Sequence, residues 1–105
     1  MPRVYLVQQG AFNRTPAKKW GSVRVLMPPM VQMLFDDPLI VDQIADGLQD
    51  IKPEDYLLLA GDPVLIGIVT AIAADMLDGE INLLKWDRQE KVYLPLHLSL
   101  YGAVN

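Results

Sequence analysis

The fold is decided by the stretch Asp55-Tyr56-Leu57-Leu58-Leu59-Ala60-Gly61-Asp62-Pro63. Residues 56–60 are apolar throughout, which is typical of a strand at the buried centre of a sheet. Asp62 and Pro63 then form a helix start, because an N-cap carboxylate accepts from the free amides of the first turn and proline loses no hydrogen bond there. The stretch therefore predicts a central strand, a tight turn and a helix.

The remaining elements are predicted from similar signals. The helix after the turn covers residues 63–78 and ends at Gly79, which suits a left-handed C-terminal cap. An earlier amphipathic helix begins at Asp36-Asp37-Pro38 and ends at Lys52-Pro53. Strands are predicted over residues 3–8, 22–27 and 81–86, with a loop over residues 9–20 and a solvated acidic pair at residues 54–55.

A final strand over residues 91–100 alternates between two faces. One face is apolar and carries Val92, Leu94, Leu96, Leu98 and Leu100. We expect it to face the core, which leaves Tyr93 and Tyr101 on the opposite, bare side. Pro95 indicates an edge strand or a bulge.

This order of elements predicts one α/β domain over residues 1–105. A strand–helix–strand unit implies a right-handed parallel crossover. We therefore expect a small Rossmann-like, mostly parallel sheet with two helices and a C-terminal β-hairpin.

The composition excludes several kinds of site. The chain has no cysteine, and His97 is its only histidine, so thiolate zinc sites, disulfides and histidine-rich metal sites are excluded. We interpret His97 as a locally hydrogen-bonded residue and expect no metal and no cofactor.

The apolar stretch 63–74 is shorter than the about 20 residues that span a bilayer. We expect a cytoplasmic protein.

Charge is segregated along the chain. Residues 1–35 carry five cations and no acid, whereas residues 36–80 carry eleven acids and one lysine. The net charge is −4. This pattern predicts one basic and one acidic surface, with ordinary solvated faces as the alternative.

One candidate ligand site combines the helix start with the loop after the first strand. The turn at Gly61 and Asp62 offers amides and a positive dipole end to an anion. If the first and central strands are parallel, the loop lies at the same end of the sheet, and Arg14, Lys18 and Lys19 converge on the turn. Against this, Asp62 fills the amides when it acts as a cap, and no glycine-rich phosphate motif is present. A capped structural helix is the alternative.

A second candidate surface is a stripe of small residues on the later helix. Gly67, Ala71 and Ala74 have no evident role in the core and would allow a second helix to approach closely. Together with Tyr93 and Tyr101, they are the candidate interface residues. We expect a homodimer, because one patch then meets its own copy.

Several segments also carry a family resemblance. They are Asp55-Tyr56-Leu57-Leu58-Leu59 with Gly61-Asp62-Pro63, then Ile72-Ala73-Ala74, Leu83-Leu84-Lys85-Trp86-Asp87-Arg88, Tyr93 and Pro95. Over about the last 50 residues the sequence resembles short bacteriophage and mobile-element proteins. The resemblance implies a protein of the infected cell's cytoplasm and attaches no activity to these motifs.

We therefore expect a phage or mobile-element accessory protein that binds a host or viral protein, without catalysis. The alternative is a nucleotide- or phosphate-binding Rossmann-like domain, or a nucleotide hydrolase built on it. Nucleic acid is disfavoured as a partner because the basic stretch belongs to a net acidic protein. No membrane partner is expected.

Overall fold

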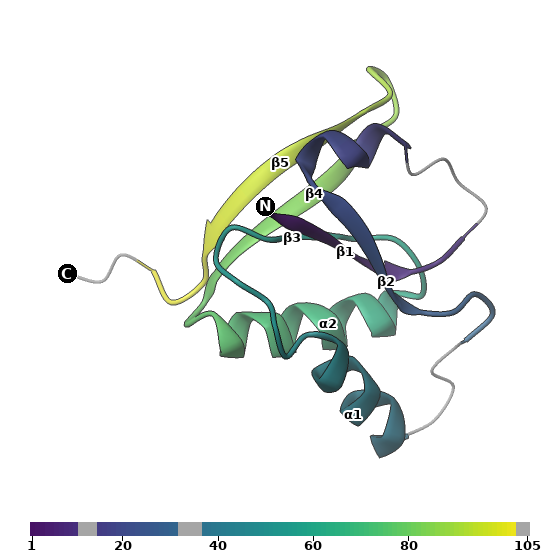
Figure 1. Ribbon diagram of the computed structural model, residues 1–105, viewed down its shortest axis with the longest axis vertical. Helices are drawn as coiled ribbons and strands as arrows, with labels where there is room; N and C mark the ends of the chain where they lie inside the picture. Colours follow the sequence, from purple (N-terminus) through teal and green to yellow (C-terminus); the bar gives the residue numbers. More distant parts are fainter. Residues whose placement is uncertain (11–14, 32–36, 103–105) are drawn as a thin grey trace.

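The computed structural model describes residues 1–10, 15–31 and 37–102, whose elements form one sheet flanked by helices (Figure 1). The strands are β1 (Arg3–Gln8), β2 (Ser22–Met27), β3 (Tyr56–Leu58), β4 (Glu80–Asp87) and β5 (Val92–Ser99). The helices are the 3-10 helix η1 (Thr15–Trp20), α1 (Pro38–Gly47) and α2 (Pro63–Met76). Within the described ranges, no helix has both the length and the apolar character needed to cross a bilayer.

The sheet has the order β2-β1-β3-β4-β5 and is mixed. β1 pairs in parallel with β2 and β3, and β3 pairs in parallel with β4. β5 is antiparallel to β4 because the short turn between them has no room for a crossover helix. The predicted α/β fold and the C-terminal hairpin are confirmed. The expected mostly parallel, Rossmann-like sheet is not.

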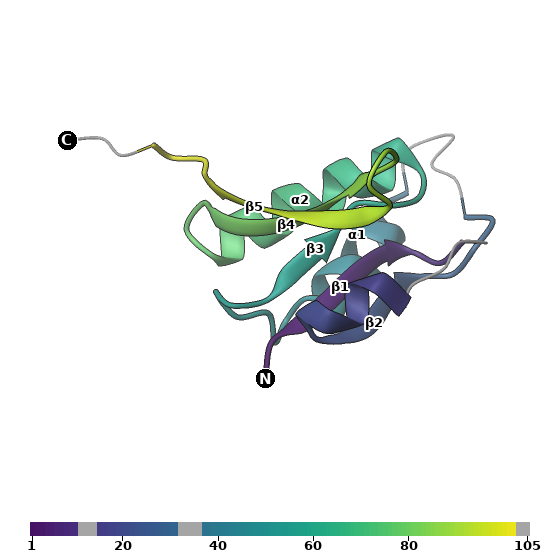
Figure 2. The same cartoon turned by 90° about the horizontal axis from the view of Figure 1, so that it is seen from above.

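Helices lie on both faces of the sheet, with α1 and α2 on one side and η1 on the other (Figure 2). The inner strand β1 is therefore buried on both faces. Tyr5 and Val7 belong to the core cluster under α1 and α2, whereas Val4 and Leu6 belong to the cluster under η1. This alternation follows the two-residue period of a strand.

The side chain of Gln8 joins three chain segments at the carboxyl end of β1. Its Nε2 donates to the carbonyls of Pro28 at 3.1 Å and Val31 at 2.7 Å, and its Oε1 accepts from the Asp62 amide at 2.8 Å. Gly61 has a φ of +121°, and a Cβ there would lie 2.4 Å from the Gln8 Cβ. The turn before α2 therefore has room for glycine alone.

Asp55 performs the same task at the opposite end of the sheet. Its two carboxylate oxygens accept from the amides of Arg3 at 2.8 Å and Lys52 at 2.9 Å. The side chain is buried, so the expectation that this acidic pair stays solvated is wrong for Asp55. A buried carboxylate needs hydrogen-bond partners, and here the backbone supplies them.

Both helix starts carry the predicted caps. Asp37 accepts from an amide in the first turn of α1. Asp62 accepts from the amides of Val64 at 3.1 Å and Leu65 at 3.2 Å. Gly79 after α2 has the predicted left-handed conformation, with a φ of +81°.

Element bounds differ from the sequence prediction by one or two residues in several places, and by more in α1 and in residues 15–20. α1 ends at Gly47 and not at Lys52, at a point where the helix backbone touches β2. A Cβ at Gly47 would lie 2.9 Å from the Leu26 side chain, so glycine permits this close approach. Residues 15–20 form η1 where a loop was predicted. Asp36 lies outside the described residues.

The role of Gln8 gives the first testable prediction. Gln8→Ala removes three hydrogen bonds and leaves partly buried backbone groups unpaired, so the free energy of unfolding should fall by about 1–3 kcal/mol. Gln9→Ala is the matched control, because Gln9 is the exposed neighbour of Gln8. Urea denaturation measures both variants. Equal stability of the two variants would contradict the role of Gln8.

Candidate functional site

A row of half-exposed apolar side chains runs along β5. We call it the β5 leucine face, and it consists of Val92 (40% exposed), Leu94 (41%), Leu96 (41%), Leu98 (39%) and Leu100 (50%). α2 packs against β1 and β4, one strand short of β5. Among the described residues, no helix covers this face.

The β5 leucine face lies on the helix side of the sheet. Leu96 pairs with Leu83 and Leu98 pairs with Ile81, and directly opposite residues share a face. Leu83 and Ile81 are both in the core cluster under α2. The apolar face of the core thus continues onto β5 after the helix layer has ended.

The prediction of which face of β5 is covered is therefore wrong. The leucine face is half exposed, whereas Tyr93 on the other face is buried. Tyr93, predicted to be bare, is 6% exposed and packs its ring edge-on against Trp86 at 4.9 Å between centroids. Alternation separates two faces but does not say which one is covered. The signal that predicts the cover is the hairpin itself, because a strand joined by a short turn brings no helix with it.

The outer edge of β5 is protected against pairing with another strand. The Leu100 amide donates to the Gly79 carbonyl at 2.8 Å, so even-numbered residues direct their backbone toward β4. Odd-numbered residues direct theirs outward. Pro95 is one of them and has no N–H to offer, which removes a donor from the middle of the exposed edge.

The other candidate interface residues divide into exposed and enclosed ones. Gly67 and Ala71 are exposed on α2, and a Cβ at Gly67 would meet nothing within 4 Å. Ala74 is 7% exposed and belongs to the core cluster that also contains residues of α1, so the expectation that it has no role in the core is wrong. Tyr101 is 60% exposed, but its ring lies against Gly79.

The basic residues predicted to bind an anion are placed as follows. Arg14 lies outside the described residues. Lys18 and Lys19 are exposed on η1, and the Lys19 ammonium lies 4.9 Å from the centre of the Trp20 ring. Trp20 in turn packs against Tyr56 at the start of β3, with ring centroids 5.5 Å apart. The structure thus places Lys19 near the beginning of β3 and not at its carboxyl end, where Gly61 lies.

The start of α2 offers few donors to an anion. The amides of Val64 and Leu65 bind the Asp62 carboxylate, and the amide of Ile66 binds the Asp62 carbonyl at 3.0 Å. Pro63 has no amide hydrogen. This turn is therefore a capped helix start, which was the alternative to an anion site.

His97 lies in a local hydrogen-bond network on the η1 side. Its Nδ1 is 2.7 Å from Asn82 Oδ1 and its Nε2 is 3.2 Å from Glu80 Oε1, so both ring nitrogens have partners. The Ser99 hydroxyl donates to Glu80. A relay of the serine–histidine type needs the hydroxyl on the imidazole, and this arrangement differs from it. The described part of the chain contains no group of three or more potential metal ligands.

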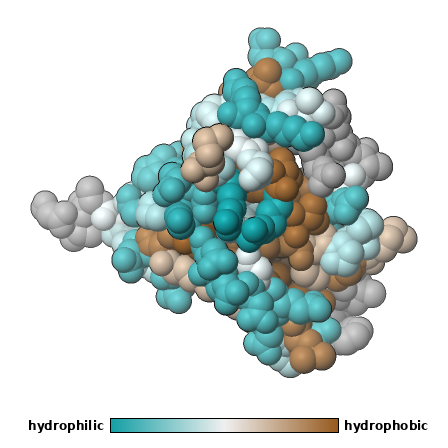
Figure 3. All heavy atoms as spheres, in the orientation of Figure 1, coloured by the Kyte–Doolittle hydropathy of each residue, from teal (hydrophilic) through white to brown (hydrophobic). Residues whose placement is uncertain are grey.

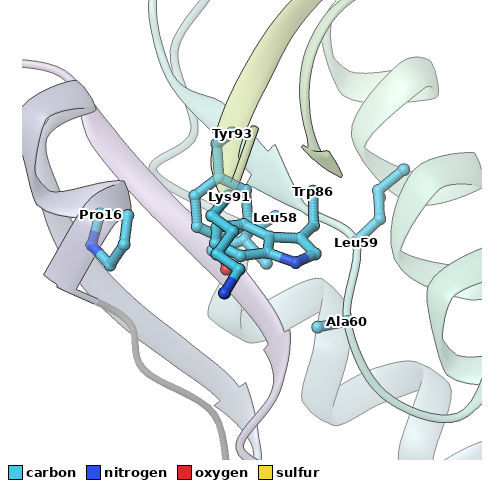
Figure 4. Close-up of a pocket in the computed structure, with 7 residues that line it drawn as sticks. All are labelled: Pro16, Leu58, Leu59, Ala60, Trp86, Lys91 and Tyr93. Atoms are coloured by element: carbon cyan, nitrogen blue, oxygen red, sulfur yellow. The ribbon is translucent and has the colours of Figure 1, made fainter. Parts of the chain in front are cut away.

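A pocket of about 540 Å³ opens on the η1 side, near the carboxyl ends of β3 and β4. Its lining consists of Pro16, Leu58, Leu59, Ala60, Trp86, Lys91 and Tyr93. Trp86, Lys91 and Tyr93 lie together, and Pro16 lies across the opening from them (Figure 4). Figure 3 shows a group of hydrophobic atoms to the right of the centre of the molecule. Burial raises the pKa of Tyr93 above its ordinary value. No feature of the sequence predicted this pocket.

Comparison with known proteins identifies the family. The family model described as Phage Pam3 gp32-like protein matches residues 2–100. The chain belongs to this family. Neither the curated proteins nor the solved structures give a match. The predicted resemblance to bacteriophage proteins is confirmed, and for the gp32-like family it extends over both halves of the chain.

The network around Glu80 yields a prediction about pH. The Ser99 hydroxyl and then His97 donate to Glu80, and these bonds hold the pKa of Glu80 below its usual range. Ser99→Ala removes the larger cause, so the pKa of Glu80 should rise toward the ordinary value. A lowered carboxyl pKa stabilises the fold above the unfolded pKa, and this contribution is lost as the pH falls through the folded pKa. The variant should therefore lose stability at neutral pH and less in strong acid.

Carboxyl-carbon NMR titration measures the pKa of Glu80 directly. Ser99→Thr is the matched control, because threonine keeps the donor hydroxyl and should leave the pKa low. An unchanged pKa in Ser99→Ala would show that the hydroxyl is not its cause.

Proposed function

We propose that this gp32-like protein is a phage accessory protein that acts by binding another protein chain, without catalysis. The observation that carries the proposal is the β5 leucine face, whose five side chains are each 39–50% exposed. Soluble chains that expose a contiguous apolar patch of this kind use it for binding. A partner that covers these apolar side chains removes them from water, which favours binding.

The geometry favours a partner that packs on the side chains and not along the strand edge. Pro95 removes a backbone donor at the edge, so an added strand would lose part of its ladder. An apolar surface of a partner meets no such obstacle at the β5 leucine face. The host or viral protein expected from the sequence therefore binds across the face of the sheet.

A capture experiment tests this role. The tagged chain is produced in cells infected by the phage that encodes it, and retained proteins are then re-assembled with the chain from purified components. Leu94→Glu places a charge in the interface and should abolish the complex. Leu39→Glu is the matched control, since Leu39 is 70% exposed on α1, away from β5. A purified complex that survives Leu94→Glu unchanged would contradict the proposal.

Ligand binding is the second candidate, and the pocket lined by Trp86 and Lys91 favours it. Its volume lies within the about 300–1,000 Å³ typical of ligand sites. An exposed indole stacks on flat rings, and a lysine neutralises a phosphate. Pockets at the carboxyl ends of parallel strands are the usual sites in Rossmann-like domains. A nucleotide is the ligand that combines a flat ring with an anion.

Tryptophan fluorescence tests the second candidate. The chain has two tryptophans, so Trp20→Phe leaves Trp86 as the sole reporter. Mono-, di- and cyclic nucleotides should quench its emission and raise the melting temperature, more weakly at high salt. Lys91→Ala should reduce both effects. No response at millimolar nucleotide would remove this candidate.

A further inference from the structure

We propose that the β5 leucine face binds the same face of a second copy of this chain, related by a two-fold axis close to Leu96. The inference rests on the proposed function, because it uses the same surface and names the occupant. It is carried by the charges at the two ends of the face, which are opposite in sign.

One end of the face carries a cation. Lys85 pairs directly with Leu94, so it shares the face of the leucines. It is exposed and forms no ion pair with any residue that the structure describes. Asp87 lies two residues further on, but its Oδ1 accepts from the amides of Gln89 at 3.0 Å and Glu90 at 3.4 Å. Asp87 keeps its negative charge, but the hairpin over residues 85–91 carries three cations and two acids, so this end is net positive. Lys85 is its cation on the leucine side.

The other end of the face carries acids. The Leu100 amide binds Gly79, which places this end of β5 beside the end of α2. Asp75 and Asp78 are both exposed there, and the last turn of α2 contains no basic residue. A helix C-terminus also carries partial negative charge, so a cation is stabilised at this place.

Asp75 lies on the side of α2 that points away from α1. Ala74 is buried in the cluster that contains Ile44 and Leu48 of α1. Ile72 and Met76 lie about 160° from Ala74 around the helix, at 100° per residue, and Asp75 lies next to Ile72. The flank formed by Ile72, Asp75 and Met76 therefore borders the uncovered side, where β5 lies.

A two-fold axis brings these opposite ends together. With the axis near Leu96, Leu94 of one copy meets Leu98 of the other, and Lys85 of one copy meets Asp75 of the other. The same contact occurs twice, once at each end. A patch with a cation at one end and an acid at the other is complementary to itself in this antiparallel arrangement, and the apolar row between them is covered by its own copy.

The area that a dimer needs sets the extent of the contact. A stable interface buries roughly 800 Å² per partner, which is about an eighth of this chain's surface of 6741 Å². Five half-exposed side chains supply less than this. The contact therefore includes the flank of α2, where Met76 is 42% exposed.

Sedimentation equilibrium of the full chain tests the dimer. The wild type should have twice the mass of one chain at micromolar concentration, and Leu96→Glu should have the mass of one. Circular dichroism verifies that the variant is folded. A wild type that stays monomeric at about 100 µM would overturn the inference, because the dissociation constant would then lie above this concentration.

Charge reversal tests the two-fold geometry and does not depend on the leucine variant. Lys85→Glu and Asp75→Lys should each weaken dimerisation by about tenfold, because each creates two like-charge contacts. The double variant should return to near the wild-type dissociation constant. Lys18→Glu, on η1 at the opposite face of the sheet, is the matched control and should change nothing. Single variants without effect, or a double variant without recovery, would overturn the proposed arrangement.

The outcomes separate this inference from the proposed function. A monomer that still binds a different protein through Leu94 would overturn the second copy as occupant and leave the proposed function standing. A monomer that binds no protein through this face would overturn both.

Discussion

The side-chain amide of Gln8 binds three backbone groups that are 20, 23 and 54 residues away along the chain. It holds the Asp62 amide at the same point where the Asp62 carboxylate begins α2. This one amide therefore fixes the start of α2 at the sheet, while the apolar core holds the rest of the helix in place. Asp55 fixes the other end of β1 in the same way. A strand buried on both faces leaves its polar neighbours no water, so each end needs an internal partner.

The sequence predicted the hydrogen bonds that form within one helix turn. It did not predict the polar contacts between residues that are distant along the chain. The caps at Asp37 and Asp62 and the left-handed Gly79 depend on residues within one turn of the helix, so residue type and spacing suffice to predict them. The sequence near Gln8 does not indicate its role, because its partners are distant along the chain. Likewise, the alternation of β5 predicted two faces correctly, but the placement of α2 decides which face is covered.

The segregation of charge along the chain matches the two sides of the sheet only in part. Lys18 and Lys19 lie on η1, on one side of the sheet, whereas Asp75 lies on α2, on the other, and Asp78 follows the end of α2. The charge pattern of the sequence had predicted one basic and one acidic surface. Lys85 and Arg24 depart from this division, because both lie on the helix side of the sheet. A uniformly acidic face would repel its own copy, and one lysine at the far end makes the face self-complementary.

The mixed sheet and the bare leucines have a common cause. A parallel strand requires a crossover connection, and the helix in that connection packs onto the face of the sheet. β5 follows β4 by a short turn, so it joins the sheet without a helix of its own. Its apolar side chains nevertheless continue the core face of β4, since directly paired residues share a side. The hairpin that makes β5 antiparallel thus also leaves its leucines uncovered. Pro95 blocks the edge while the face stays open, so association is directed to the leucines and away from strand addition.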